Sequence, residues 1–164
     1  MERTLIVIRH AKSDWDVPLG DSERPLADRG RRQAPAVGRW IATHLGSPDL
    51  AVVSPAARAL QTWELVAAEL SPDPPVRVEP DAYTFSGDDL LDVVSGLPAD
   101  VSSVALVGHT PAAEELVEAL TGRWVRLPTA SVAVVGLRDW RSETGRLRAA
   151  GRPADEDVEL DRQR

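Results

Sequence analysis

Residues 4–15 read TLIVIRHAKSDW, an apolar run that ends abruptly in two basic residues. The apolar part, residues 5–8, is rich in β-branched side chains, which is typical of a short strand buried on both faces. In open α/β sheets, ligand sites lie at the carboxyl ends of parallel strands. Arg9 and His10 at such an end would place an anion-binding guanidinium beside a nucleophilic imidazole.

Two later apolar runs end in a similar way. One leads into SPAARALQT at 54–62, and the other leads into GHTP at 108–111. In both, a hydroxyl residue followed by proline predicts the start of a helix. Arg58 is then expected in the first turn of one helix, and His109 just before the other. Because helix N-termini favour anions, the convergence of these side chains on one crevice indicates a phosphate site.

These motifs resemble those of the histidine phosphatase superfamily. The hallmark of that family is RHG, so the RHA of this chain departs from it slightly. The matching motifs are RHA at 9–11, RPLADRGRRQA at 24–34, SPAARALQT at 54–62 and GH at 108–109. They occur in the family's order, which is more specific than any single motif. The short chain and the KSDW that follows the RH pair are most similar to the SixA-type phosphohistidine phosphatases.

The resemblance implies both a fold and a set of roles. The fold would be a three-layer α/β sandwich, phosphoglycerate mutase-like, with a mostly parallel central sheet and helices on both faces. His10 would attack phosphorus and become phosphohistidine, from which water would release phosphate. Arg9, Arg58 and His109 would bind the phosphoryl oxygens, and Arg24 is a further candidate for that role. Neither a metal ion nor an organic cofactor is expected.

The chemistry sets conditions on these residues. Phosphoryl transfer needs an in-line nucleophile and partners that neutralise the equatorial oxygens. His10 can attack only through an unprotonated ring nitrogen, and neighbouring arginines disfavour its imidazolium form. Arg58 in a first turn opposes the helix dipole unless an anion compensates for it. His44, near the end of a predicted helix where a cation is favoured, is interpreted as structural.

Four carboxylates are candidates for the general acid that would protonate the leaving group. Many family members place a glutamate after an extra strand, and Glu79 and Asp81 lie in that part of this chain. Asp14 and Asp16, in the loop beyond His10, are alternatives. We select Asp81 as the candidate acid, against the alternative that it is a solvated turn carboxylate. A phosphohistidine substrate would reduce the need for an acid, because imidazole leaves more readily than an alkoxide.

The chain as a whole has 164 residues, is 43% hydrophobic, carries a net charge of −7 and contains no cysteine. We expect one domain over residues 1–150, followed by a charged, loosely ordered tail over 151–164. Acidity argues against nucleic-acid binding, and the absence of cysteine excludes disulfides and thiol catalysis. No signal peptide or membrane-spanning run is expected, so the predicted location is cytoplasmic, without membrane contact.

Several local patterns complete the prediction. Polar residues with Pro18 and Gly20 predict a loop after the first strand. Thr129 is interpreted as a strand-entry residue, although the resemblance would allow it near the pocket. Helices are expected over residues 28–45, 55–70, 86–95 and 111–120, and further strands over 76–78, 131–137 and 147–149.

The predicted function is hydrolysis of a phosphomonoester or phosphohistidine, on a protein substrate, through phospho-His10. Mutases and sugar-phosphate phosphatases of the family generally carry extra segments that close over a small substrate. No connection in this chain is long enough for a substantial lid, and an open cleft suits a phosphorylated protein surface. The alternatives are a small-metabolite phosphatase, for sugar or nucleotide phosphates, and a non-catalytic phosphate-binding module. A mutase is disfavoured, because nothing indicates a site for a second phosphate.

Overall fold

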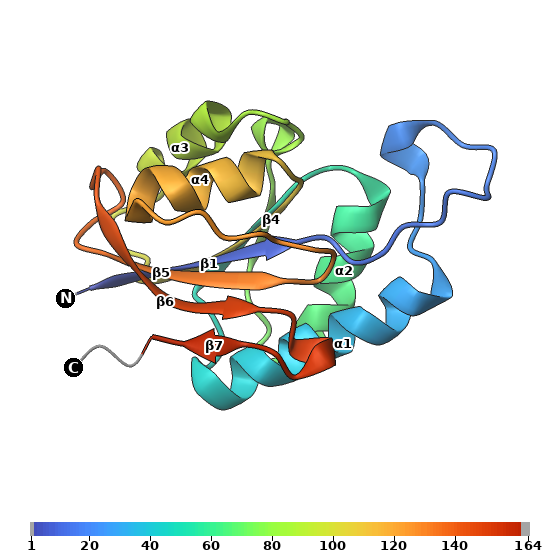
Figure 1. The fold of residues 1–164 in the computed structure, drawn as a ribbon, viewed down its shortest axis with the longest axis horizontal. Coiled ribbons are helices and arrows are strands. Elements are labelled where there is room, and N and C mark those ends of the chain that lie inside the picture. The colour runs from blue at the N-terminus through green and yellow to red at the C-terminus, as the bar shows by residue number, and fades with distance from the viewer. Residues whose placement is uncertain (1, 162–164) are drawn as a thin grey trace.

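The computed structural model describes residues 2–161, which form an α/β fold around one seven-stranded sheet (Figure 1). The strands lie in the order β3-β2-β4-β1-β5-β6-β7. They are β1 (Arg3–Arg9), β2 (Leu50–Val53), β3 (Val76–Val78), β4 (Ser103–Gly108), β5 (Val132–Leu137), β6 (Gly145–Gly151) and β7 (Glu159–Leu160). The α-helices are α1 (Asp28–His44), α2 (Ala57–Ala67), α3 (Gly87–Ser95) and α4 (Ala112–Thr121), with short 3-10 helices η1 (Asp21–Glu23), η2 (Pro80–Ala82) and η3 (Pro153–Asp155).

The sheet combines a parallel half with an antiparallel half. Strands β3, β2, β4 and β1 run parallel to one another, so their carboxyl ends share one edge. Strands β5, β6 and β7 continue the sheet with antiparallel pairings. The predicted α/β class is confirmed, and the parallel half gathers the motif residues at one edge.

Helices cover both faces of the sheet, as predicted. In β1, Leu5 and Val7 pack into the core beneath α3 and α4, whereas Ile6 and Ile8 pack into the core beneath α1 and α2 (Figure 1). Alternate residues of a strand point to opposite faces, so one apolar run supplies both cores. Each fully buried side chain of this size contributes about 1.5–3 kcal/mol. The strand that carries Arg9 is therefore firmly held.

The C-terminal segment differs from its prediction. Residues 151–161, expected as part of a loosely ordered tail, form η3 and β7, and the boundary predicted at residue 150 falls inside β6. Pro153 is buried, and Arg152 Nε donates a hydrogen bond to the Thr129 carbonyl at 2.8 Å. The low apolar content was misleading because backbone pairing and this guanidinium order the segment. Residues 162–164 lie outside the described part.

None of the helices within residues 2–161 combines the length and apolarity that a bilayer-spanning segment needs.

Candidate active site

A pocket of about 240 Å³ lies at the carboxyl edge of the parallel strands. It brings together five residues that the sequence nominated for phosphate chemistry: Arg9, His10, Arg24, Arg58 and His109. The rest of its lining is Lys12, Ser13, Trp15, Asp21, Phe85, Thr110 and Thr129. Three of the nominated residues follow β1, β2 and β4, and the parallel topology explains why they meet.

His10 lies at the base of this pocket and is buried. Its Nδ1 is 2.7 Å from the Ala11 carbonyl oxygen. A carbonyl only accepts, so Nδ1 carries the proton and Nε2 of the neutral ring keeps its lone pair. Burial lowers the pKa of His10 to about 3, and the charges of His109, Arg58 and Arg9 act in the same direction. The ring is therefore neutral near pH 7. The main cause is burial, whereas the sequence pattern had indicated the neighbouring arginines as the cause of the neutral ring.

Arg58, the second residue of α2, is buried against both histidines. Its Nε lies 3.4 Å from His10 Nε2, and its Nη2 lies 3.4 Å from His109 Nδ1. The two imidazole centroids are 5.2 Å apart. One guanidinium edge thus faces two ring nitrogens, an arrangement that can hold an oxyanion beside the lone pair of His10.

His109 is oriented by Ser54, which was predicted only as a helix cap. The hydroxyl Oγ of Ser54 lies 2.7 Å from His109 Nε2, whereas α2 begins later, at Ala57. A guanidinium only donates, so His109 Nδ1 accepts from Arg58 and Nε2–H donates to Ser54. Burial, together with the charges of Arg58 and Arg9, lowers the pKa of His109 to about 4, although the charge of Asp21 opposes this shift. In the neutral ring, the lone pair of His109 Nδ1 therefore faces Arg58.

Arg9 and Arg24 complete the cationic lining. Arg9 donates from Nη1 to the Leu127 carbonyl at 3.0 Å, and burial lowers its pKa. Arg24 is buried; its Nε donates to Ser13 Oγ at 3.3 Å, and its guanidinium carbon lies 3.6 Å from the Trp15 ring centroid. Arg9 is anchored by a neutral carbonyl, whereas Arg24 is held by Ser13, by the Trp15 ring and by an ion pair of its Nη2 with Asp21.

The motif residues without charge hold the backbone around His10. Gln33 Oε1 accepts from the Lys12 N–H at 3.1 Å, and Thr62 Oγ1 accepts from the Ala11 N–H at 2.9 Å. A Cβ on Gly30 would lie 2.2 Å from the Lys12 carbonyl oxygen, so only glycine permits this approach of α1. These contacts explain why the motifs at 24–34 and 54–62 include these uncharged residues.

Asp81, predicted as the general acid, lies elsewhere. It is exposed in η2, outside the pocket lining, and its backbone N–H donates to Glu79 Oε2 at 3.3 Å. The turn buries Ala82 instead and directs Asp81 to solvent. Asp14 and Asp16 also lie outside the lining. The structure therefore places Asp81 outside the pocket, and this geometry does not support its predicted role as the general acid.

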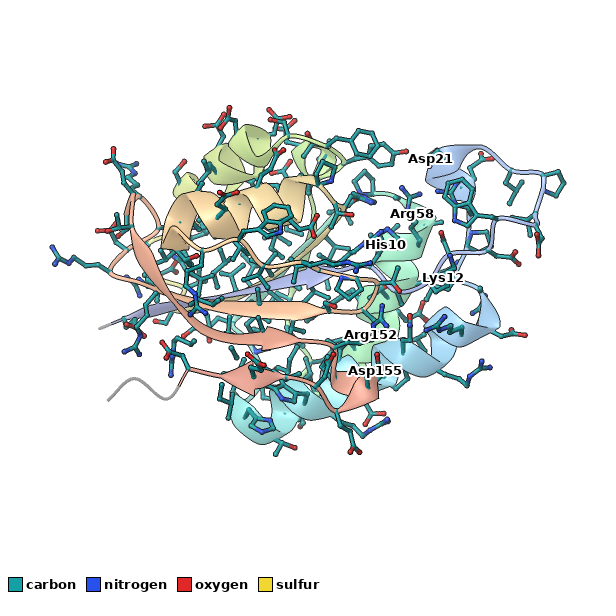
Figure 2. All side chains as sticks on the ribbon, in the orientation of Figure 1. His10, Lys12, Asp21, Arg58, Arg152 and Asp155 are labelled. Carbon is teal, nitrogen blue, oxygen red and sulfur yellow. The ribbon has the colours of Figure 1, made fainter. Side chains whose placement is uncertain are left out.

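Asp21 is the pocket carboxylate that the sequence interpretation missed. The loop that contains it was expected to be a plain polar connection, but its η1 turn brings Asp21 to the pocket (Figure 2). Its Oδ1 lies 2.7 Å from Arg24 Nη2, and its Oδ2 lies 3.1 Å from Arg58 Nη2. The Tyr83 hydroxyl also donates to Oδ2. The bond from Tyr83, with those from Arg24 and Arg58, holds the pKa of Asp21 well below its usual range, although burial opposes this.

The charge of the pocket suits an anion and not a metal ion. Lys12 joins the three arginines, against the single carboxylate of Asp21. Among residues 2–161, no three His, Asp or Glu side chains cluster as metal ligands would. The arrangement can therefore bind a tetrahedral oxyanion next to an unprotonated imidazole nitrogen.

Comparisons with known proteins agree with this geometry. A sequence model of the histidine phosphatase superfamily (branch 1) matches residues 5–82. An uncharacterised Mycobacterium tuberculosis protein is 32% identical over 109 residues, a segment that covers 66% of each chain. The SixA protein of Nakamurella multipartitia superposes with a TM-score of 0.82 and 27% identity, covering 92% of this chain and 96% of its own.

A second solved structure is that of the protein histidine phosphatase SixA complexed with tungstate. It matches with a TM-score of 0.82 and 25% identity, covering 93% of this chain and 98% of its own. The RH motif, the shared fold and these matches lead to one conclusion. The chain belongs to the histidine phosphatase superfamily, and its fold is SixA-like.

Proposed function

We propose that this protein hydrolyses phosphohistidine or a phosphomonoester on a protein substrate, through a phosphoryl intermediate on His10. One observation carries the proposal: the lone pair on His10 Nε2 lies against the Nε–Nη2 edge of Arg58, with His109 on the same edge. A nucleophile and the groups that neutralise the phosphoryl oxygens are thus assembled before substrate binds.

The first step is transfer of the phosphoryl group to His10. The Nε2 lone pair attacks phosphorus in line, the N–P bond forms, and the bond to the leaving atom breaks with its electron pair. Arg58 and Arg9 neutralise the equatorial oxygens, and the Nδ1 lone pair of His109 accepts a hydrogen bond from a phosphoryl oxygen that carries a proton. The Ala11 carbonyl accepts from Nδ1–H of His10 and stabilises the positive charge that develops on the ring.

The second step regenerates the enzyme. Water attacks phosphorus from the side that the leaving group vacated, the N–P bond breaks, and its electron pair returns to Nε2. The water proton passes to the phosphate or to solvent, so inorganic phosphate leaves and His10 is again neutral. Burial favours the neutral imidazole, which is the form in which His10 is released from phosphorus.

Two exposed aromatic side chains in the pocket lining favour a substrate that carries a ring or a protein segment. Trp15 and Phe85 line it and remain 68% and 63% exposed. Exposed aromatic side chains beside a polar pocket offer stacking surface to an imidazole ring or to a protein segment. A small sugar phosphate would leave most of that surface in water. This favours a protein phosphohistidine over a small metabolite.

A rapid-quench experiment tests the intermediate. Mixing the protein with a histidine protein phosphorylated by phosphoramidate should trap acid-labile, base-stable phosphate on His10. A His10→Ala variant should lose turnover and trapping together, and full turnover by that variant would rule the intermediate out. A panel of sugar and nucleotide phosphates, compared by kcat/KM, decides the substrate class. Tight phosphoprotein binding without phosphate release would instead support the non-catalytic module.

A further inference from the structure

We propose that Asp21 is a positioning residue that holds one edge of the Arg58 guanidinium, so that the other edge meets the phosphoryl group beside His10. The inference deepens the proposed function, because it concerns the same phosphate site. It gives a role to the one carboxylate of the pocket lining, which touches neither histidine by a hydrogen bond.

The argument begins with the two usable edges of a guanidinium. The side edge carries Nε and Nη2, the end edge carries Nη1 and Nη2, and either can bind an oxyanion with two parallel hydrogen bonds. In Arg58, the side edge faces the ring nitrogens of His10 and His109, each at 3.4 Å. At 3.4 Å these contacts are longer than ordinary hydrogen bonds, so the side edge can still donate to an oxyanion, which is a stronger acceptor.

The end edge of Arg58 is already occupied by Asp21. Nη1 donates to the Asp21 main-chain carbonyl at 2.6 Å, and Nη2 donates to its Oδ2 at 3.1 Å. Both contacts are shorter than those on the side edge. A guanidinium held at two points along its end cannot rotate in its plane without breaking both bonds, so the side edge keeps its direction.

Asp21 is itself held from two other directions. Arg24 binds Oδ1 at 2.7 Å, and the Tyr83 hydroxyl donates to Oδ2. The Tyr83 ring in turn lies 5.2 Å from the His109 ring. The carboxylate therefore links the loop after His10, helix α2 and the segment after η2, and fixes Arg58 relative to all three (Figure 2).

A competing role for Asp21 predicts the opposite change in anion affinity when the carboxylate is removed, so an experiment can distinguish the two roles. A carboxylate beside Arg58 also cancels part of the charge that attracts phosphate, and could act as a substrate mimic that blocks the site. If blocking dominated, removal of the carboxylate would tighten anion binding. If positioning dominates, removal loosens anion binding and slows phosphoryl transfer. The separate side edge left beside the histidines favours positioning.

The experiment compares Asp21→Ala, Asp21→Asn and Glu23→Ala. Glu23 is a matched control, since it lies in the same η1 turn, is exposed and is absent from the pocket lining. We expect Asp21→Ala to lower kcat/KM by about 10- to 100-fold, the usual cost of losing a group that orients a functional side chain. Asp21→Asn keeps one carbonyl acceptor, so its kcat/KM should lie between the values of Asp21→Ala and the wild type. Glu23→Ala should match the wild type.

A double-mutant cycle shows whether Asp21 acts through Arg58. If it does, the loss caused by Asp21→Ala should nearly vanish in an Arg58→Ala background, because the oriented group is already gone. Fully additive losses in that cycle would overturn the proposal. Far-ultraviolet circular dichroism of each variant separates these effects from unfolding.

Orthovanadate binding keeps this test separate from the proposed function. Calorimetry with orthovanadate measures anion affinity whether or not the protein turns over a phosphoprotein. The Kd should rise by about 10-fold or more in Asp21→Ala, a loss of ~1.4 kcal/mol. Tighter vanadate binding by this variant would establish the blocking role instead. Absence of turnover in the wild type, with the vanadate result intact, would refute the proposed function alone.

Discussion

The Nε of Arg58 lies 3.4 Å from Nε2 of His10, and the helix that carries Arg58 begins only one residue earlier. The positive end of the helix dipole repels an arginine in the first turn, and this repulsion destabilises the protein when the pocket is empty. A bound oxyanion offsets the repulsion, since both the dipole and the guanidinium attract it. The same placement therefore disfavours an empty site and favours a filled one.

The planar fork of Arg58 should be essential. Arg58→Lys keeps the charge but cannot bind Asp21 and an oxyanion along two edges. We expect kcat/KM to fall by about 100-fold or more, as when a preorganised oxyanion donor is removed. Steady-state assays on a phosphohistidine protein measure this. Arg39→Lys, an exposed change in the Arg39–Glu69 ion pair, is the control. Equal activity of the two variants would contradict the role of the fork.

The pH dependence should have no acid limb near the ordinary histidine pKa. His10 must be neutral to attack, and its pKa is lowered to about 3, with His109 lowered to about 4. As pH falls from 7, His10 stays neutral well past 6.5, so its protonation should not reduce kcat/KM until the solution reaches about pH 4. The profile should be measured with a substrate of pH-independent charge. A half-loss near pH 6.5 would show that His10 is not held neutral.

The same shifts predict acid destabilisation of the fold. An unfolded histidine has the ordinary pKa of about 6.5, above the folded values of about 3 for His10 and about 4 for His109. Between those values the unfolded chain binds more protons, so stability is complete above 6.5 and is lost as the pH falls. The slope is at most about 1.4 kcal/mol per pH unit for each histidine.

Urea titrations from pH 7 to about pH 4.5 test this slope, in a window chosen above the usual carboxylate titrations. A His10→Gln, His109→Gln double variant should unfold with a flatter pH dependence than the wild type, because neither glutamine titrates. Parallel curves for the two proteins would show that other groups carry the acid sensitivity.

The phosphate residues could be predicted from sequence for a physical reason. Arg9, His10 and His109 each lie within two residues of the end of an apolar run, and parallel pairing of β1 with β4 places Arg9 opposite Gly108. The apolar runs, and the rule that the carboxyl ends of parallel strands share one edge of a sheet, are then enough to predict that these three residues meet. Arg58 needed only a helix-start signal in addition, and a helix boundary error of two residues left it at the pocket.

The missed features depend on contacts that no local pattern encodes. Asp21 reaches Arg58 across 37 positions, and Ser54 reaches His109 across 55. The only sequence signal for Asp21 was its spacing of three residues from Arg24, an ordinary ion-pair spacing. The segment beyond Gly151 is ordered by pairing with β6, which an apolar-residue count does not detect.

Ser54 should matter more than a helix cap would. Ser54→Ala leaves the buried Nε2–H of His109 without an acceptor, which costs about 1–3 kcal/mol of folding stability. It also frees the ring to take the other tautomer, so Nδ1 would donate before substrate binds. We expect a lower free energy of unfolding and a changed kcat in the same variant. Ser95→Ala, at an exposed helix end, is the control. A variant with wild-type stability would mean that His109 finds another partner.

Lys12 offers a direct probe of the pocket, because it is the single lysine of the chain. It lines the same pocket as His10 (Figure 2), and within residues 2–161 its side chain makes no hydrogen bond or ion pair. An amine-reactive reagent should therefore modify Lys12 and the N-terminal amine. Orthovanadate in the pocket should slow labelling of Lys12, since a bound anion both pairs with its ammonium and obstructs access.

Peptide mapping by mass spectrometry reads the two amines separately, so the N-terminal amine is an internal control for reagent decay. We expect vanadate to slow Lys12 modification several-fold and to leave the N-terminal rate unchanged. The Arg58→Lys variant would add a second lysine, so protection should be compared in Arg58→Ala instead, where vanadate should no longer protect Lys12. Equal protection in that variant would mean that the anion binds near Lys12 without the Arg58 fork, and the single phosphate site argued from the pocket geometry would have to be divided in two.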